Sequence, residues 1–353
     1  MNLLVTGGAG FIGSNFVRHW RARHPADAIT VLDALTYAGN RANLDGVENV
    51  EFVHGDIRDF DLASRLLRER DIDTLVHFAA ETHVDRSIAG PDRFVETNVL
   101  GTHVLLRAAR EVWLGRGRPH RFHHVSTDEV YGSLAPDEPP FTEQSPFRPS
   151  SPYAASKAAS DLLVRVYHRT YGLQTSVSNC CNNFGPRQFP EKLVPLFVIN
   201  ALTGRPLPVY GDGGNVRSWL QVEDCCRAIE LAVEKGRAGE TYNIGGDEMT
   251  NLAVAECLCA AIDSLFAARP ALARRYPNCP AAEGRPTAAL RTFVEDRPGH
   301  DRRYALDDGK ARRELGYAPR RVFAQALRET VAWYADNEAW WRRAPGANAA
   351  EPA

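Results

Sequence analysis

The chain has 353 residues, 44% of them hydrophobic and 24% charged, and its formal net charge is −2. These values fit an ordinary globular protein of one large or two smaller domains, and they give no reason to expect a nucleic-acid or membrane partner. No apolar run approaches the length of about 20 residues that spans a bilayer. The seven cysteines lack zinc-ribbon spacing, and the chain begins directly with a predicted strand. We therefore expect a cytoplasmic protein with reduced thiols.

The first predicted element is a strand at Leu3–Val5, followed by a glycine-rich turn and a helix over Phe11–Arg23. A strand, a glycine turn and a helix in this order are the context that a dinucleotide-binding motif requires. Glycines let the backbone approach a pyrophosphate, and the first turn of the helix offers it free amide groups. We assign these residues to a cofactor site: Gly7, Gly10, Phe11, Ile12 and Gly13.

A second strand, Ile29–Leu32, ends in Asp33, which lies 20 residues after Gly13. An acidic residue at this place binds the ribose hydroxyls of the adenosine and selects NAD over NADP. Later strands at Val50–Val53, Thr74–Phe78 and Gln174–Ser178 alternate with helices, including one from about Pro91 to Val112. From the ends of these strands and from that helix we add further cofactor residues: Asp56, Ile57, Ala79, Ala80, Asn98 and Cys180.

Two of these strand ends allow other interpretations. Asp56 is expected to contact the adenine, but it could be a solvated loop aspartate. His83, Asp85 and Arg86 follow the Thr74–Phe78 strand and either line a sugar pocket or form a turn network.

The stretch from Val125 to Lys157 carries the strongest chemical signal. Thr127, Asp128 and Glu129 stand where a strand at Phe122–Val125 ends, which is where ligands bind in an open parallel sheet. Tyr153 and Lys157 follow, four residues apart in a predicted helix, and so share one helical face. An ammonium near a phenol favours the phenolate, so we expect a tyrosine base with a pKa below its usual value.

Lysine is rare in this chain, because only four of its 42 basic residues are lysines. Arginine has a planar fork and a high pKa and cannot replace a lysine in such a role. A lysine at position 157 therefore favours catalysis over the alternative of a solvated Tyr-Lys pair.

The alternation of strands and helices predicts an α/β fold, a Rossmann-like doubly wound parallel sheet over residues 1–180. Residues 222–246 are expected to return to this sheet, and residues 346–353 to form a disordered tail. Residues 181–345 are richer in proline and glycine and predict a smaller mixed substrate-binding domain. Its basic residues are candidates for binding phosphate groups: Arg187, Lys192, Arg217, Arg297, Arg302 and Arg303.

Together, these motifs resemble the extended short-chain dehydrogenase/reductase superfamily and, within it, the dTDP-glucose 4,6-dehydratases. The resemblance rests on GGAGFIGSN, LTYAGN, VSTDEVYG, YAASK, SNCCNNFGP, FPEKLVPL and TYNIGG. The pair Asp128-Glu129 is the most discriminating, because related sugar-nucleotide epimerases keep the tyrosine and lysine but lack it.

The resemblance implies an NAD-dependent homodimeric lyase that acts on a sugar nucleotide. Tyr153 would take the proton of the C4 hydroxyl, Glu129 would remove the C5 proton, and Asp128 would protonate the departing C6 hydroxyl. Thr127 would hydrogen-bond the C4 oxygen. A role in the deoxysugar branch of antibiotic biosynthesis is a further expectation.

The resemblance also implies a set of substrate contacts. Asn182 or Asn183, Arg217, Asn251 and Arg297 are expected near the pyrophosphate, Glu191 and Lys192 beside the nucleotide base, and His83 in the sugar pocket. The chain departs from the family pattern at Ser218, Gln221 and Cys225, where Asp, Tyr and His are usual. Loss of the aspartate beside Arg217 leaves open the alternative of a dehydratase for UDP-glucose or UDP-GlcNAc. An alternative of a different class is a non-catalytic NAD-sensing protein on the same fold.

Overall fold

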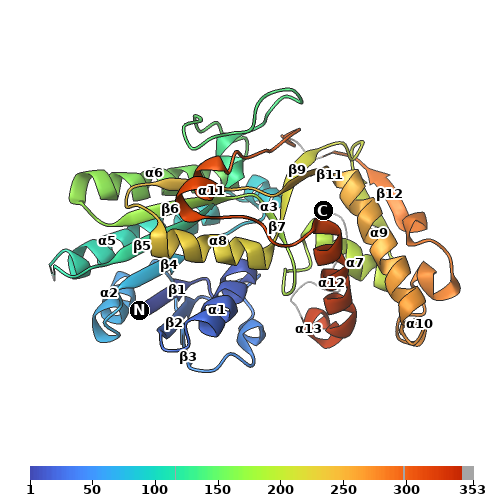
Figure 1. Cartoon of the computed structure of the whole chain (residues 1–353), viewed down its shortest axis with the longest axis horizontal. Coiled ribbons are helices and arrows are strands. Elements are labelled where there is room, and N and C mark those ends of the chain that lie inside the picture. Colours follow the sequence, from blue (N-terminus) through green and yellow to red (C-terminus); the bar gives the residue numbers. More distant parts are fainter. Residues whose placement is uncertain (116, 297–298, 344–353) are drawn as a thin grey trace.

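The structure is a computed structural model that describes residues 1–115, 117–296 and 299–343. Its larger part is a seven-stranded sheet in which every neighbouring pair is parallel (Figure 1). The strands are β1 (Asn2–Thr6), β2 (Ala28–Asp33), β3 (Val50–His54), β4 (Thr74–His77), β5 (Arg121–Thr127), β6 (Thr175–Cys180) and β10 (Thr241–Ile244). The doubly wound α/β fold expected from the sequence is confirmed.

The strand order is β10-β6-β5-β4-β1-β2-β3, so the winding direction reverses between β1 and β4. In such sheets a crevice opens outside the carboxyl ends of the strands at this reversal. The glycine turn after β1 and the catalytic motif after β5 therefore come to the same edge of the sheet. β5 extends two residues beyond the predicted Val125, which places Thr127 at the strand end itself.

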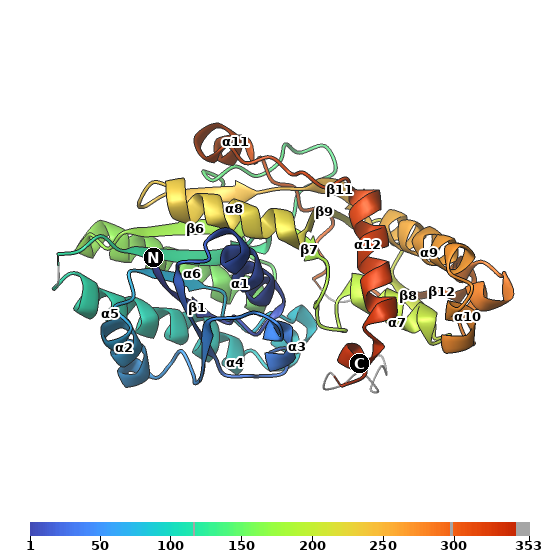
Figure 2. The same ribbon diagram turned by 60° about the horizontal axis from the view of Figure 1, so that its bottom comes forward.

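Helices cover both faces of the sheet. One face is covered by α1 (Phe11–Arg23), α8 (Val222–Lys235) and α11 (Gly309–Leu315), whose apolar side chains share one core with β1, β2 and β10. The other face is covered by α2 (Phe60–Glu69), α5 (Thr102–Trp113) and α6 (Pro152–Tyr171), which pack on a second core. Figures 1 and 2 show α1 and α8 lying side by side, although more than 190 residues separate them in the sequence.

The predicted helix over Pro91–Val112 is built from three consecutive pieces. They are α4 (Asp92–Phe94), a π-helical turn (Val95–Gly101) and α5, and the short α3 (Val84–Ala89) precedes them. π-helical turns inside helices are rare and often occur at functional sites. This one contains the buried Asn98.

The remaining elements form a separate core beside the sheet (Figure 2). A three-stranded sheet pairs β7 (Asn182–Phe184), β9 (Val216–Gln221) and β11 (Asp247–Thr250), and a two-stranded sheet pairs β8 (Leu207–Tyr210) with β12 (Arg291–Val294). The helices are α7 (Leu193–Leu202), α9 (Asn251–Ala268), α10 (Leu272–Arg275), α12 (Phe323–Asp336) and α13 (Glu338–Arg342). Short 3-10 turns occur at Arg41–Leu44, Asp128–Tyr131, Pro280–Glu283 and Thr287–Leu290.

Helix α9 corrects one statement of the sequence analysis. It is the one described helix that is long and apolar enough, by length and composition, to cross a membrane. Its apolar side chains include Val254, Leu258 and Ile262, which are fully buried against α7 and α12. The apolar character of α9 is therefore accounted for by packing inside the protein.

Candidate active site

A cavity of about 630 Å³ lies at the carboxyl ends of the strands, where the winding reverses. Its walls contain all five predicted catalytic residues and every predicted cofactor residue except Asn98. Of the predicted substrate residues, Asn182, Glu191 and Lys192 line the cavity, and so does the alternative Asn183. His83, Arg217 and Asn251 do not line it, and Arg297 lies outside the described residues.

The glycine turn after β1 is shaped by close backbone contacts. Gly7 has a φ of +70°, and a Cβ atom there would lie 2.5 Å from the Ala79 nitrogen. A Cβ atom on Gly13 would lie 2.2 Å from the carbonyl oxygen of Gly7. Only glycine fits at either position, and the first turn of α1 is thereby held against the cavity wall. This cradle is the kind of site that accepts a dinucleotide pyrophosphate.

Asp33 is held at the end of β2 by two backbone hydrogen bonds. Its Oδ2 accepts from the Ala9 amide at 2.9 Å and its Oδ1 from the Leu35 amide at 2.8 Å. Burial raises the pKa of this carboxyl group, while the two amides oppose the change. The side chain lines the cavity next to the glycine turn, as expected for a ribose-binding acid.

The predicted acid–base residues occupy the end of β5 and the 3-10 turn that follows. The Thr127 hydroxyl accepts from the Glu129 amide at 3.3 Å and donates to Asp128 Oδ1 at 3.3 Å. Asp128 is 2% exposed, and its Oδ2 atom has no hydrogen-bond partner among the described residues. Burial, reinforced by the neighbouring Glu129, raises the pKa of Asp128 to about 8. The carboxyl group is therefore protonated at neutral pH.

Tyr153 lies in the first turn of α6, which begins with good capping residues. The Ser151 hydroxyl accepts from the Ala154 amide at 3.1 Å, and Pro152 occupies the first helical position. The predicted direction of the Tyr153 pKa is wrong for this structure. Burial and the negative charge of Glu129 raise the pKa of the phenol well above its usual value. The spacing between Tyr153 and Lys157 predicts a cation near the phenol ring, but it does not predict the nearby carboxyl groups of Glu129 and Asp128.

Lys157 is buried one turn further along α6. Its Nζ donates to the Val125 carbonyl at 2.9 Å and lies 3.3 Å from His124 Nε2. Burial lowers the pKa of this ammonium to about 8, while the negative charge of Asp161 acts in the opposite direction. The lysine is thus held in a fixed place by the backbone of β5.

Asn98 has a different place from the one that the sequence predicts. It does not line the cavity, because its amide is used inside the protein. The side chain accepts from the Glu81 amide at 2.9 Å and donates to the Glu81 carbonyl at 3.0 Å and to the Ser156 hydroxyl at 2.8 Å. Asn98 therefore ties the cavity wall after β4 to helix α6.

A cluster of charged side chains closes the far end of the cavity. Glu191 lies 3.5 Å from His83 Nε2 and 3.4 Å from the Arg86 guanidinium, and Lys192 Nζ donates to the Thr82 carbonyl at 3.0 Å. His83 also caps α3, so this histidine serves a turn network as well. The sequence analysis missed two aromatic cavity residues here, Tyr37 and Phe189, whose rings meet edge to face at 5.6 Å.

Arg217 and Ser218 lie beside the cavity rather than in its wall. The Arg217 guanidinium donates to the Val216 and Asp301 carbonyls, each at 2.8 Å, and stacks 4.2 Å from the Tyr304 ring. The Ser218 hydroxyl is buried and bonded to both backbone groups of Gly246 at 3.0 Å. The departure at Ser218 therefore does not alter the wall of the cavity.

Comparison with known proteins agrees with this geometry. Residues 4–330 match the family model described as GDP-mannose 4,6 dehydratase. The chain is 48% identical to the dTDP-glucose 4,6-dehydratase of Escherichia coli, over 97% of this chain and 96% of that one. The enzyme of the same name from Neisseria meningitidis is 50% identical over 96% of this chain and 95% of its own.

Solved structures give the same result. The dTDP-glucose 4,6-dehydratase DesIV from Streptomyces venezuelae, crystallised with NAD, is 52% identical and has a TM-score of 0.86, covering 98% of this chain and 100% of that one. A UDP-glucose 4-epimerase from Thermotoga maritima has a TM-score of 0.80 at 29% identity, covering 96% of this chain and 100% of that one. The fold is thus shared with epimerases, and the higher identity to dehydratases separates the two groups. The chain belongs to the dTDP-glucose 4,6-dehydratase family, whose members are NAD-dependent hydro-lyases.

Proposed function

We propose that this protein converts dTDP-glucose to dTDP-4-keto-6-deoxyglucose by C4 oxidation, loss of water across C5 and C6, and reduction at C6. The observation that carries the proposal is the acid pair Asp128 and Glu129, placed in one cavity with Tyr153 and Lys157. An epimerase needs only the oxidation step and has no use for these carboxyl groups. The relatives with about half of their residues identical are dTDP-glucose 4,6-dehydratases over nearly their whole length.

The cavity fits NAD, because the glycine turn leaves room for a pyrophosphate and Asp33 stands where a ribose would lie. Gly7, Gly10, Gly13 and Asp33 would hold the adenosine half of the cofactor, and Tyr153 and Lys157 would stand at the nicotinamide end. When bound, NAD⁺ accepts the hydride and later returns it, and its positively charged ring favours ionisation of a nearby phenol.

Tyr153 takes the proton from the C4 hydroxyl in this proposal. The buried phenol needs positive charge beside it to ionise, because Glu129 and Asp128 raise its pKa. Lys157 supplies a fixed cation on the same face of α6. The Thr127 hydroxyl is placed between the acid pair and the tyrosine and would bind the C4 oxygen.

Asp128 and Glu129 then perform the elimination. A 4-keto group acidifies the C5 proton, which Glu129 removes as general base. Asp128 donates its proton to the departing C6 hydroxyl, and its pKa of about 8 supports this role because an acid must be protonated at neutral pH. The negative charge of Glu129 favours the protonated form of Asp128, and a neutral Asp128 in turn favours the charged form of Glu129.

The nucleotide half of the substrate would occupy the end of the cavity formed by Glu191, Lys192 and Asn182. Arg217, Asn251, His83 and Arg297 remain proposed contacts, and the first three require a shift of their side chains to reach a ligand in the cavity. The UDP-sugar alternative rested on Ser218, and the burial of that side chain outside the cavity wall weakens it. The NAD-sensing alternative is disfavoured by the complete set of acid–base residues.

The direct test is to incubate the purified protein with dTDP-glucose, UDP-glucose and UDP-GlcNAc, without added NAD⁺. Loss of water detected by mass spectrometry, together with the near-ultraviolet absorbance of the alkali-treated keto sugar, would identify the product. Dehydration of dTDP-glucose alone is the expected result. Dehydration of a UDP-sugar would overturn the substrate assignment, and no product from any donor with NAD bound would favour the sensor.

A homodimer is part of the proposal. Six large apolar side chains on α3, the π-helical turn, and α6 are about half exposed: Ile88, Val95, Leu100, Leu162, Val166 and Tyr171. These elements pack on one another, and exposed apolar side chains gathered on neighbouring elements often mark an interface. We place a two-fold contact between copies of α6 and of the π-helical turn with α5.

We also keep three further expectations as proposals. The first is the division into domains. Residues 1–180 form the Rossmann domain, residues 181–345 form the substrate-binding domain, and residues 222–246 within the latter return to the Rossmann domain. All seven cysteines are free, which fits a reducing compartment such as the cytoplasm. A place in antibiotic deoxysugar biosynthesis is the third of these proposals. The tail predicted at 346–353 lies outside the described residues.

A further inference from the structure

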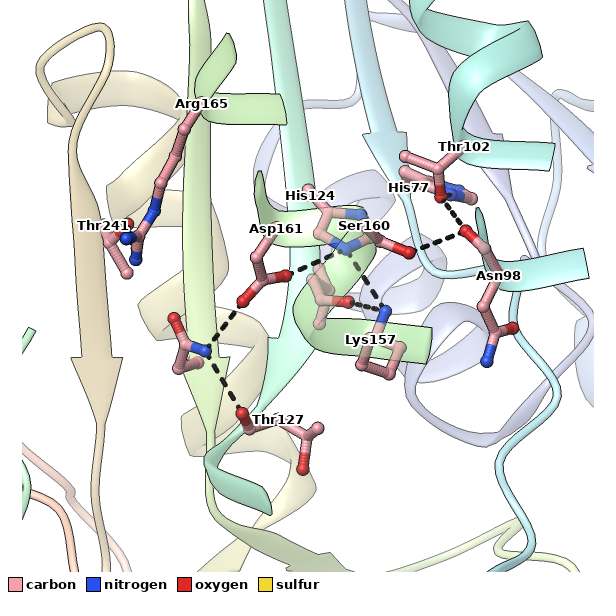
Figure 3. A network of polar contacts seen from close by, with 12 residues as sticks. His77, Asn98, Thr102, His124, Thr127, Lys157, Ser160, Asp161, Arg165 and Thr241 are labelled. Carbon is pink, nitrogen blue, oxygen red and sulfur yellow. Dashed lines mark hydrogen bonds and ion pairs between the residues drawn. The ribbon is translucent and has the colours of Figure 1, made fainter. Parts of the chain in front are cut away.

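A second polar cluster lies behind Lys157, on the side away from the cavity. His124 of β5 and Asp161 of α6 are both fully buried there (Figure 3). Neither residue lines the cavity, and neither can touch a bound ligand. Burying a carboxyl group and an imidazole without solvent is costly, so the cluster needs a reason within the protein.

The geometry joins the two residues to the catalytic lysine. His124 Nε2 lies 3.3 Å from Lys157 Nζ and 3.3 Å from Asp161 Oδ1. In any one protonation state this nitrogen either accepts from the ammonium or donates to the carboxylate. The three groups therefore form one coupled unit in which a change of charge at Asp161 is felt at Lys157.

Asp161 also reaches the catalytic turn through Asn179. The Asn179 amide donates to Asp161 Oδ2 at 3.1 Å and to the Thr127 carbonyl at 3.1 Å. One buried carboxylate is thus linked to both halves of the acid–base machinery. The His124 imidazole links Asp161 to Lys157, and the Asn179 amide links Asp161 to the end of β5.

Resting on the function proposed above, we propose that Asp161 is a positioning residue whose negative charge, acting across His124, keeps the Lys157 ammonium protonated beside Tyr153. Lys157 is 4% exposed, and burial favours the neutral amine. Burial already brings its pKa down to about 8, and Asp161 is the largest influence in the opposite direction. Without that charge the lysine would be neutral over much of the neutral pH range, and Tyr153 would lose its cation.

Other titratable groups surround the unit and do not replace Asp161. His77 of β4 is neutral, because burial lowers its pKa well below the usual value, and its two nitrogens are bound to Thr6 and Thr102. The hydrogen bond with the Cys225 thiol, together with burial, raises the pKa of Cys180 on β6, so this thiol carries no charge at neutral pH. Arg165 acts on Asp161 from α6, where it helps to keep the carboxyl group ionised. On the cavity side are Tyr153, Asp128 and Glu129.

The test uses the scarcity of lysine. Protein labelled with ¹³C at lysine Cε gives four resonances, and Lys157→Met identifies the one from the site. In the NAD-loaded enzyme, Asp161→Asn should lower the titration midpoint of the Lys157 resonance by about one pH unit or more, because an isosteric amide removes the charge alone. An unchanged midpoint in folded Asp161→Asn protein would overturn the proposal.

Ser160→Ala is the matched control, because Ser160 lies next to Asp161 and its hydroxyl is buried on the Asn98 and Ser156 carbonyls. This variant removes packing and hydrogen bonds without removing charge, so the Lys157 midpoint should stay in place. An equal shift in Ser160→Ala would attribute the effect to loosened packing and would also overturn the proposal.

If Asp161→Asn does not fold, the wild-type enzyme still provides the test. The pKa of Asp161 is about 6, so the Lys157 resonance should show a second inflection in that acid range as the carboxylate is neutralised. Absence of that inflection would contradict the coupling. These outcomes do not depend on the substrate, so a wrong assignment of dTDP-glucose would leave the lysine titration as predicted.

Discussion

The Asp128 carboxyl group shows how one residue can favour the reaction and oppose folding. In the unfolded chain an aspartic acid loses its proton near pH 4, whereas the folded protein keeps the Asp128 proton up to a pH of about 8. Because the folded state binds more protons between these values, the free energy of unfolding decreases as pH rises from about 4 to about 8. Keeping the Asp128 proton that the elimination requires therefore lowers the free energy of unfolding.

Asp128→Asn should therefore unfold at a higher denaturant concentration than the wild type at pH 7, with a gain on the order of a few kcal/mol, since the amide has no proton to lose. The gain should vanish below about pH 4, where both states of the wild type are protonated. Dehydration should fall by about 10²–10⁴-fold, as expected for loss of a general acid. Urea titrations at the two pH values and product analysis measure these effects.

Asp137→Asn is the control for that measurement, because Asp137 is exposed in the loop after the catalytic turn. Surface substitutions of this kind change stability by only about 0.5 kcal/mol. Equal stability of Asp128→Asn and wild type at pH 7 would show that the Asp128 carboxyl group is ionised in the folded protein and would remove it as the acid.

Glu129→Gln tests the other half of the pair. The variant should lose exchange of the C5 proton with solvent, because the amide cannot accept that proton, while it still reduces part of the bound NAD⁺. Mass spectrometry of sugar recovered from deuterated water and the near-ultraviolet absorbance of NADH give the two readings. Normal deuterium incorporation would exclude Glu129 as the base.

Among the structural elements, the turn between β1 and α1 depends most on glycine, because it has no room for a side chain. Gly13→Ala places a Cβ atom 2.2 Å from the Gly7 carbonyl oxygen, so the turn must open. We expect NAD affinity to fall roughly tenfold or more, which corresponds to a loss of about 1.4 kcal/mol of binding free energy. Isothermal titration with NAD⁺ on protein freed of cofactor measures this change.

Gly90→Ala provides the comparison, because a Cβ atom at Gly90 meets no atom within 4 Å and the φ of −155° at this residue lies outside the left-handed region that favours glycine. Its affinity for NAD⁺ should match that of the wild type. A similar loss in both variants would mean that the effect is general to glycine replacement and not a property of the turn.

The elements themselves could largely be predicted from the sequence. Helix α8 and strand β10 lie within residues 222–246, the segment expected to return to the sheet, and the glycine turn, Asp33 and the end of β5 lie in one cavity. These signals are local, because each depends on a spacing within one strand, turn or helix. Burial was harder to predict, and the apolar helix α9 was not singled out at all.

What the sequence could not provide depends on contacts between distant elements. The pKa of Tyr153 moves in the opposite direction to the prediction because the phenol is buried and the carboxyl groups of Glu129 and Asp128, in the 3-10 turn after β5, act on it. Asn98 was predicted to touch the cofactor, yet packing of the π-helical turn against α6 directs its amide into the protein. Asp161 stands four residues after Lys157, and this spacing was the one available signal for the cluster behind the lysine.

For the whole molecule, the proposed dimer gives the clearest prediction. Leu162→Glu with Val166→Glu places two charges on the exposed apolar face of α6, and we expect the protein to become monomeric in sedimentation experiments. Val322→Glu is the control, since Val322 is 69% exposed and directly precedes α12, which packs in the separate core beside the sheet. A dimer that survives the double substitution would place the contact elsewhere.

The return of the chain to the large sheet has a consequence for synthesis on the ribosome. Strand β10 completes the sheet, and Ala311, Leu315 and Tyr317 complete the core over α1 and α8. The first 180 residues therefore emerge from the exit tunnel with one apolar face only partly covered, by α1. At about 5–20 residues per second, that face waits on the order of ten seconds for its cover. During this interval the nascent chain is a client for chaperones, and a stalled or truncated product would be prone to aggregate.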